Sequence, residues 1–279
     1  MLGALHAATT DQARALVTPE AASAGYVRRA LRVLAADGLV QGTPVGRSHE
    51  HVWYLTSAGV QAWAIAEGRD IPRRPPIRPA MVAAAMLEHA LAVTATAAAF
   101  TAAGVGRPAN WRLEVEHRYG PGPRQKLRSD AVLQAEDGEG WPQALLVEVD
   151  RATLAGGRLL GEVRGYRAYA AERIAARGTR IGSIRQNWER DYLGADRCPP
   201  VLFVLTGATR AVLERRRERL VDQSRQELSR NWRLRHGNLD VGVVLLEDLV
   251  KFGPCEPIVR ALDSGGWVRV DGMRGIGER

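Results

Sequence analysis

The chain has 279 residues, 46% of them hydrophobic and 25% charged, a composition that supports a folded core and excludes a disordered chain. Lysine and arginine number 39 against 31 aspartate and glutamate residues, and the net charge of +8 favours a polyanionic partner. We expect a cytoplasmic protein without membrane association, because no apolar run nears the roughly 18 residues that span a bilayer and no secretory signal pattern is visible.

The first 67 residues predict a small helical module with a hairpin. Thr9 and Thr10 are suitable caps for a helix in DQARALV, and Thr18 with Pro19 predicts the start of a second helix that ends at Gly38. Two strand candidates, LVQ and EHVWYLT, follow and are joined by a polar loop, before a helix in SAGVQAWAIAEG. The second helix is amphipathic, and the face opposite its apolar side carries Tyr26, Arg28, Arg29 and Arg32.

This order of elements resembles the winged helix-turn-helix family over nearly all of residues 1–67. In such modules the second helix enters the major groove and the hairpin wing contacts the backbone or the minor groove. The resemblance implies that double-stranded DNA is bound by Tyr26, Arg28, Arg29 and Arg32 of the helix and by Arg47 of the wing. The alternative interpretation is a solvated helix face, or a module for dimerisation or protein binding.

Residues 68–79 predict a linker between two domains. The string GRDIPRRPPIRP contains four prolines and opens with a glycine, a composition that resists both helix and strand. We therefore expect a DNA-binding domain at 1–67 and a larger domain at 80–279.

The larger segment predicts alternating helices and strands. A long helix from Pro79 to Gly104 precedes three strands, WRLEVEHRY, KLRSDAVLQ and ALLVEVDRA. A helix over 158–177, a buried strand in PPVLFVLTG, a charged helix over 208–234 and a last strand in DVGVVLLEDLV follow. This order predicts an α/β domain with a mixed central sheet. Within the charged helix, opposite charges three and four residues apart indicate a solvated, ion-paired surface.

Acidic residues on two of these strands suggest a metal site. Glu148 and Asp150 are two apart and therefore project from one face, and a neighbouring strand can bring Asp130 within reach of both. Clustered carboxylates repel one another unless a hard cation such as Mg²⁺ neutralises them, and such an ion can activate water against a phosphodiester. The alternatives are a turn position for Asp130, and a solvated face or pairing with Arg128 and Arg151 for the other two.

The helix–meander–helix pattern is similar to the PD-(D/E)XK nuclease superfamily, whose restriction-endonuclease-like fold we expect here. Asp130 in SDAV matches its first acidic position and Glu148 in EVD its second, but Asp150 stands where the family has lysine. Lys126, which shares strand parity with Asp130, is a candidate substitute, as is Arg151. Glu162 and Tyr166, four apart, resemble the Gln-x-x-x-Tyr signature of the exonuclease branch, so Tyr166 joins the catalytic candidates.

Three further sites receive little support from the sequence. A covalent tyrosine mechanism lacks the histidine cluster that it needs, and His117, at the end of its strand, is expected to be exposed. Cys198 and Cys255 are expected to be semi-buried thiols without a metal or disulfide role.

The winged helix together with the strings HALAV, RSDAV, LLVEVDRAT and GYRAY resembles the replication-relaxation family of plasmids and integrative elements over most of the chain. The resemblance implies a role in plasmid replication or mobilisation, with Mg²⁺-dependent cleavage by an endonuclease or nickase as one outcome. The alternative function is a non-catalytic replication or transfer accessory factor, and the presence of Asp150 in the lysine position favours this alternative. A homodimer and replication or transfer proteins remain open as partners.

Overall fold

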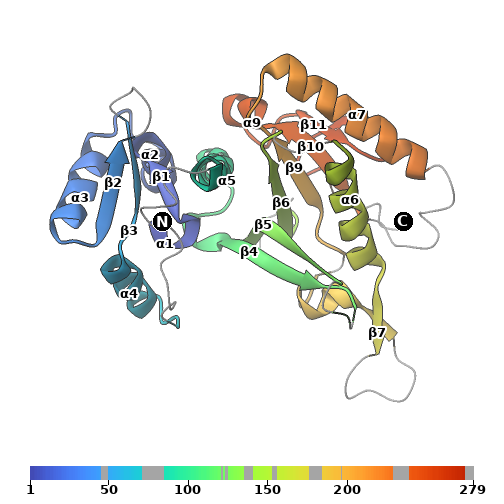
Figure 1. The fold of residues 1–279 in the computed structure, drawn as a ribbon, viewed down its shortest axis with the longest axis horizontal. Coiled ribbons are helices and arrows are strands. Elements are labelled where there is room, and N and C mark those ends of the chain that lie inside the picture. The colour runs from blue at the N-terminus through green and yellow to red at the C-terminus, as the bar shows by residue number, and fades with distance from the viewer. Residues whose placement is uncertain are drawn as a thin grey trace. The chain divides into compact units, whose positions relative to one another are not determined.

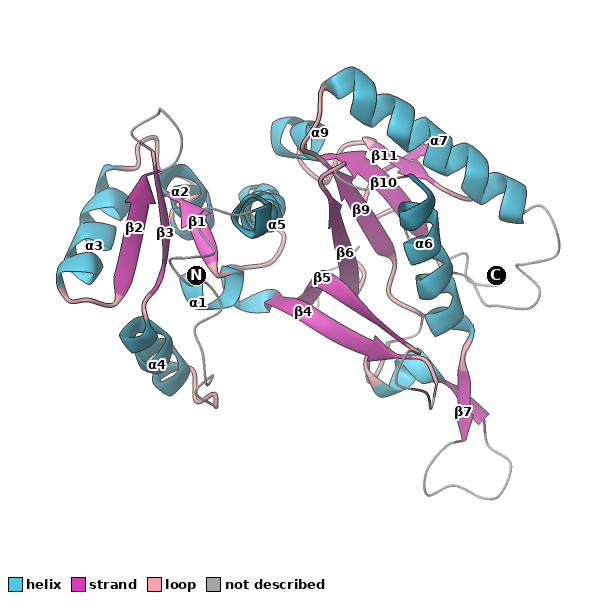
Figure 2. Cartoon of the chain, viewed as in Figure 1, coloured by secondary structure: helices cyan, strands magenta, loops and turns pink. Residues whose placement is uncertain are grey.

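The computed structural model describes residues 1–44, 50–70, 85–120, 122, 125–134, 141–152, 156–175, 184–195, 197–228 and 239–273 (Figures 1 and 2). The chain forms two units, Met1–Arg112 and Leu113–Arg279. The first contains a small antiparallel sheet and the second a larger mixed sheet, so the predicted α/β class with a mixed sheet is confirmed. Residues 71–84, which include most of the expected linker, lie outside the described residues.

The first unit is built on a three-stranded antiparallel sheet in the order β1-β3-β2. Its elements are α1 (Leu2–Leu5), β1 (Ala7–Thr9), α2 (Thr10–Val17), α3 (Gly25–Ala36), β2 (Val40–Pro44), β3 (His51–Leu55), α4 (Ser57–Ala66) and α5 (Ala85–Ala102). The predicted cap of α2 is confirmed, because the Thr9 hydroxyl accepts from the Gln12 amide at 3.2 Å and the Gln12 side chain accepts from the Thr9 amide at 2.9 Å.

The predicted helix start at Thr18 and Pro19 is wrong. Helix α3 begins at Gly25. The Ala21 amide donates to the Thr18 carbonyl, and the Arg14 guanidinium donates to the Ala21 carbonyl at 2.7 Å. These bonds hold the connection between α2 and α3 as a turn.

Helix α5 packs on the small sheet, although the sequence placed it in the larger domain. One face of the sheet presents Ala8 and Trp53 to α2 and α3, and the other presents Val52 and Tyr54 to Leu87 of α5. The buried Thr94 hydroxyl of α5 donates to the carbonyl of Ala7 in β1 at 2.6 Å. The first unit therefore extends to Arg112, well past the expected boundary at 68–79.

The second unit is built on a seven-stranded sheet in the order β12-β11-β10-β9-β6-β5-β4. Its strands are β4 (Trp111–Arg118, which begins in the first unit), β5 (Lys126–Gln134), β6 (Ala144–Asp150), β9 (Val201–Leu205), β10 (Val241–Leu245), β11 (Val259–Ala261) and β12 (Trp267–Val268). Strands β6, β9 and β10 run parallel, whereas β5 is antiparallel to β6. A two-stranded ribbon, β7 (Arg173–Ala175) with β8 (Ile184–Gln186), lies outside this sheet.

Helices α6 (Gly156–Ala171) and α7 (Arg210–Leu228) lie side by side on one face of the large sheet (Figure 1). Each crosses over between neighbouring parallel strands, α6 from β6 towards β9 and α7 from β9 to β10, which accounts for their common face. The core beneath them includes Val163, Tyr166, Phe203, Leu220 and Val243. Glu148 and Asp150, at the carboxyl end of β6, alternate with the same strand face as the core residue Leu146, so they lie on the face that α6 and α7 cover.

Two predicted elements are wrong in detail. The helix expected over 158–177 ends at Ala171 and is followed by β7. The expected strand over 240–250 ends at Leu245, and α9 (Leu246–Phe252) occupies the rest. Glu247 and Asp248 lie in the first turn of α9, where acidic side chains favour a helix.

Within the part of the chain that is described, no helix combines the length and the apolarity that a membrane crossing requires. Cys255 is half-buried as expected, whereas Cys198 is buried, and both are free thiols. Burial raises the pKa of the Cys198 thiol well above its ordinary value.

Candidate active site

Asp130 and Glu148 are brought together by the pairing of β5 with β6. The last pair of this antiparallel register is Ala131 with Val147, and Asp130 and Glu148 are the residues next to that pair on the two strands. An oxygen of the Asp130 carboxylate accepts from the Val149 amide at 2.7 Å. Burial and the adjacent Asp130 carboxylate raise the pKa of Glu148 well above its ordinary value. The two predicted acids therefore form a close pair whose joint ionisation is unfavourable.

Tyr166 of α6 holds the Glu148 side chain from above the sheet. Its hydroxyl donates to Glu148 Oε1 at 2.5 Å and lies 2.9 Å from Ser129 Oγ. The Tyr166 side chain is 1% exposed, and burial together with the Glu148 carboxylate raises its pKa well above the ordinary value. A buried phenol of this kind is a poor nucleophile, so Tyr166 serves as a hydrogen-bond donor to Glu148.

The hydrogen bonds continue to His117 of β4. His117 Nε2 lies 2.8 Å from Ser129 Oγ, and the imidazole packs against the rings of Tyr169 and Tyr192. A phenol carries one proton, so Tyr166 donates to only one of Glu148 and Ser129 at a time, and the donor between Ser129 and His117 is set by the imidazole tautomer. The expectation that His117 is exposed is wrong: it is 1% exposed, and its Nε2 is hydrogen-bonded to the buried Ser129 hydroxyl.

Asp150 is on the same face of β6 as Glu148 but has a different partner. Its Oδ2 accepts from Nε of Arg216, on α7, at 2.5 Å, in a pair that is largely buried. The sequence left pairing with Arg128 and Arg151 open, and the structure adds Arg216 of α7 as a partner of Asp150. Arg216 and Arg217 both turn inward, whereas Arg210 pairs with Glu214 on the surface, so α7 is a solvated, ion-paired helix only in part.

Glu162 adds a third acidic side chain near the pair. It lies on α6 one turn before Tyr166. Burial raises the pKa of Glu162, and the carboxylates of Asp150 and Asp130 raise it further, whereas Arg158 and Arg216 oppose that change. The Arg158 guanidinium lies 3.6 Å from the Glu162 carboxylate. Negative charge is thus concentrated around Asp130, Glu148 and Glu162.

Lys126 is not close to this cluster. Its ammonium group pairs with Glu116 of β4 at 2.6 Å, in an exposed position. The two bonds from Lys126 and Arg118 lower the pKa of Glu116. The structure therefore gives Lys126 an ion-pairing role at the first residue of β5, whereas Arg216 lies beside Asp150.

Asp130 and Glu148 suit a magnesium ion that keeps most of its own water. Mg²⁺ is commonly held by one or two carboxylates together with substrate phosphates. In the described ranges no three His, Cys, Asp or Glu side chains are arranged to hold a metal ion. The predicted set of Asp130, Glu148 and Asp150 is therefore not assembled as a three-ligand site in the described residues; Asp150 is engaged by Arg216, and Asp130 and Glu148 are the two carboxylates that could hold such an ion.

The residues predicted to contact DNA lie on the outer surface of α3. Tyr26 is 71% exposed, and Arg28, Arg29 and Arg32 are exposed as well. Arg28 and Arg32, one turn apart, line a hollow of about 740 Å³ together with Gly42 of β2 and His51 and Trp53 of β3. The helix and the hairpin thus border one concave surface. Arg47 of the predicted wing lies outside the described residues.

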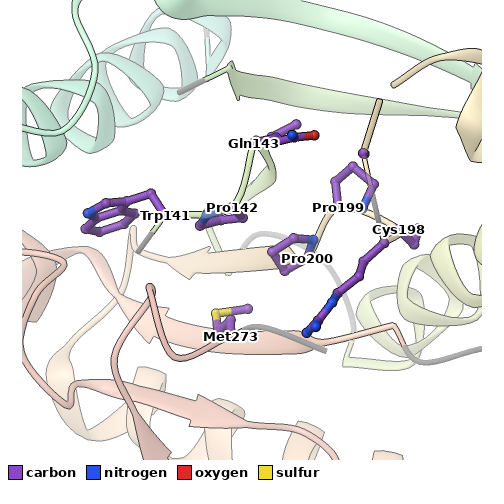
Figure 3. Close-up of a pocket in the computed structure, with 10 residues that line it drawn as sticks. Trp141, Pro142, Gln143, Cys198, Pro199, Pro200 and Met273 are labelled. Atoms are coloured by element: carbon purple, nitrogen blue, oxygen red, sulfur yellow. The ribbon is translucent and has the colours of Figure 1, made fainter. Parts of the chain in front are cut away.

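A second hollow, of about 240 Å³, lies where β6 and β9 begin (Figure 3). Trp141 and Pro142 line it just before β6, and Pro199 and Pro200 line it just before β9. This is the end of the parallel strands opposite to Asp150. No acidic side chain is among the lining residues, so the chemistry of the acids belongs to the carboxyl end.

Comparison with known proteins identifies one relationship. The sequence model of the replication-relaxation family matches residues 1–182, which include the first unit, both strands of the acid pair and helix α6. No curated protein matches the chain, and no solved structure does.

Proposed function

The chain belongs to the replication-relaxation family, and we propose that it binds the DNA of a mobile element and cleaves a phosphodiester in a magnesium-dependent reaction. In this proposal the first unit is a winged helix-turn-helix module and the second a restriction-endonuclease-like domain. The observation that carries the cleavage proposal is the Asp130–Glu148 pair on the adjacent strands β5 and β6 of a mixed sheet, where Tyr166 holds Glu148.

Four residues have distinct proposed roles at this site. Asp130 and Glu148 would hold the cation, which would polarise the phosphodiester and lower the pKa of a bound water. Tyr166 fixes the orientation of Glu148, because its hydroxyl is itself anchored at Ser129. Arg216 places a positive charge beside Asp150, in the region where the nuclease pattern has lysine.

The N-terminal unit supports the DNA-binding half of the proposal. Arg28, Arg29 and Arg32 are exposed on one side of α3, and Arg28 and Arg32 face the β2–β3 hairpin across the same hollow. A helix with cations beside a hairpin is the arrangement that a winged module presents to a DNA groove. We expect the R28A/R32A variant to bind duplex DNA at least tenfold more weakly, with a flatter dependence on salt.

The cleavage proposal is tested by metal-dependent melting and by cutting. The full-length protein is melted in EDTA and with Mg²⁺ or Mn²⁺, and it is incubated with supercoiled and linear DNA. A ligand at a hundred times its dissociation constant adds about 2.7 kcal/mol to the free energy of unfolding, which shifts the melting temperature measurably. Glu148→Gln should lose this shift and the cutting. Glu116→Gln, an acid-to-amide change on β4 at the Lys126 pair, should keep both.

A non-catalytic accessory factor is the second candidate function. The observation that favours it is the Asp150–Arg216 pair, which leaves one predicted metal ligand neutralised. If the wild type shows neither a metal-dependent melting shift nor cutting, the cleavage proposal falls. DNA binding that still depends on Arg28 and Arg32 would then support the accessory role.

A further inference from the structure

A small basic pocket lies between α6 and α7, at the side of the acidic cluster. It has a volume of about 170 Å³, several times the roughly 30 Å³ that one water occupies in the liquid. Its walls include Ala152, which follows β6, and Leu159 of α6. Three arginines of α7, Arg215, Arg216 and Arg219, line the remaining side with Gln223. The pocket is thus an apolar recess with guanidinium groups along one wall.

The charges of this pocket are strongly one-sided. No acidic residue is among its lining residues. Arg215 and Arg219 are exposed, and neither has an ion pair among the described residues. Apolar walls weaken dielectric screening and therefore concentrate the field of such cations on a small anion. Guanidinium groups offer paired N–H donors whose geometry matches that of phosphate oxygens.

Arg216 connects this pocket to the candidate active site. Its guanidinium lines the pocket and also donates to Asp150 at 2.5 Å. The same residue lies close enough to Glu162 to oppose the rise in that carboxyl's pKa. The Arg216 side chain would therefore lie between an anion in the pocket and the Asp150 carboxylate.

We propose that this pocket binds a backbone phosphate of a nucleic-acid strand, next to the phosphodiester at the acid pair. The inference rests on the proposed function, because it assumes that a strand passes Asp130 and Glu148. Arg215 and Arg219 carry the phosphate, and Arg216 has a positioning role between the phosphate and Asp150. A neighbouring anchor of this kind fixes the register of the strand without reading its bases.

The experiment compares two double variants of equal charge change in the full-length R28A/R32A protein, which removes the proposed duplex site. R215Q/R219Q empties the pocket of two cations. R225Q/K251Q removes two exposed cations of the same unit that do not line the pocket. Each protein is titrated in EDTA with a twelve-nucleotide thymidine strand and with inorganic phosphate, at several salt concentrations. Metal plays no part, so the result does not depend on cleavage.

We expect R215Q/R219Q to bind the thymidine strand at least tenfold more weakly and to lose about 0.7 from the salt slope for each phosphate contact removed. The R225Q/K251Q control should change less than twofold. Unchanged binding of the strand by R215Q/R219Q overturns the proposal. Loss of inorganic phosphate binding alone, with the strand unaffected, also overturns it and assigns the pocket to a free phosphate. Pocket-dependent binding in a protein that cuts no DNA leaves the inference standing and removes only the cleavage proposal.

Discussion

Glu148 carries an electrostatic penalty in the folded protein without metal, because its pKa is raised by burial and by Asp130. Above its ordinary pKa of 4.5 the unfolded chain releases this proton more readily than the folded protein, so stability falls as the pH rises. We expect Glu148→Gln, which can still accept the Tyr166 bond, to raise the free energy of unfolding at pH 7 in EDTA. The gain equals the free energy by which burial and the Asp130 carboxylate disfavour the ionised form of Glu148.

Urea unfolding at pH 7 and at pH 4.5 measures this gain, which should shrink at the lower pH. Glu116→Gln is the matched control with the opposite sign, since ion pairs with Lys126 and Arg118 lower the pKa of Glu116. The Glu116→Gln variant should be less stable than the wild type at pH 7, and this difference in the free energy of unfolding should disappear as the pH falls through the pKa of Glu116. A Glu148→Gln protein that is destabilised equally at both pH values contradicts our account of the acid pair.

The sequence predicted part of this site, because Glu148 and Asp150 obey the alternation of a strand. The adjacent residues Ser129 and Asp130 do not obey this alternation. Ser129 bonds Tyr166 and Asp130 lies beside Glu148, so both side chains are on the same face of β5. The burial of His117 does have a signal in the sequence, because His117 continues the alternating series Trp111, Leu113 and Val115. The contact between Arg216 and Asp150 has no signal in the sequence. The two residues are 66 positions apart, and the packing of α7 on the sheet brings them together.

At the level of elements, Gly207 fixes how the loop after β9 lies against the end of β6. Its φ is +81°, and a Cβ would lie 2.4 Å from the Arg151 carbonyl oxygen. We expect Gly207→Ala to lose more stability than Gly194→Ala, which has a φ of +82° and open space around it. Both variants carry the backbone strain of a positive φ, about 1–2 kcal/mol. The additional stability lost by Gly207→Ala therefore measures the clash of its Cβ with the Arg151 carbonyl.

Thermal or urea unfolding of the two glycine variants provides the measurement, and the metal-dependent melting shift provides a second one. Because Thr206 donates from its amide to the Asp150 carbonyl at 2.9 Å, displacement of this loop should also move Asp150. Equal losses in the two variants contradict a steric role for Gly207.

Long, regular elements were predictable and short ones were not. Strands β4, β5, β6 and β9 have at least five residues with clear apolar patterns, and their bounds were predicted closely. Strands β1, β7, β8, β11 and β12 have two or three residues, too few for a periodic signal, and depend on pairing with distant strands. Pro19 is typical of a helix start, but the bond from the Arg14 guanidinium to the Ala21 carbonyl stabilises a turn there.

At the scale of the whole molecule, the boundary between units follows packing more than composition. The proline-rich segment 68–79 looked like a boundary because prolines exclude regular structure. Helix α5 lies beyond it, however, and covers the face of the small sheet that would otherwise expose Ala7, Val52 and Tyr54. Elements on both sides of residues 68–79 in the sequence therefore belong to the same unit.

This arrangement predicts different behaviour for two N-terminal fragments. A fragment of residues 1–112 should unfold cooperatively in urea, because it retains α5 and the bonds from Thr94 to Ala7 and from Gln12 to Leu91. A fragment of residues 1–67 exposes Val52 and Tyr54, which are at most 2% exposed in the unit. Burying a large apolar side chain contributes roughly 1.5–3 kcal/mol, against a total stability of about 5–15 kcal/mol.

We therefore expect the shorter fragment to unfold at much lower urea concentration, or to lack a cooperative transition, when the two are compared by circular dichroism. Thr94→Val in the longer fragment gives a milder control, because it removes the hydrogen bond to Ala7 and preserves the shape of the side chain. Its loss should be about 1 kcal/mol, far below that of the truncation. Equal stability of the two fragments would contradict the assignment of α5 to the first unit and would favour a boundary at residues 68–79.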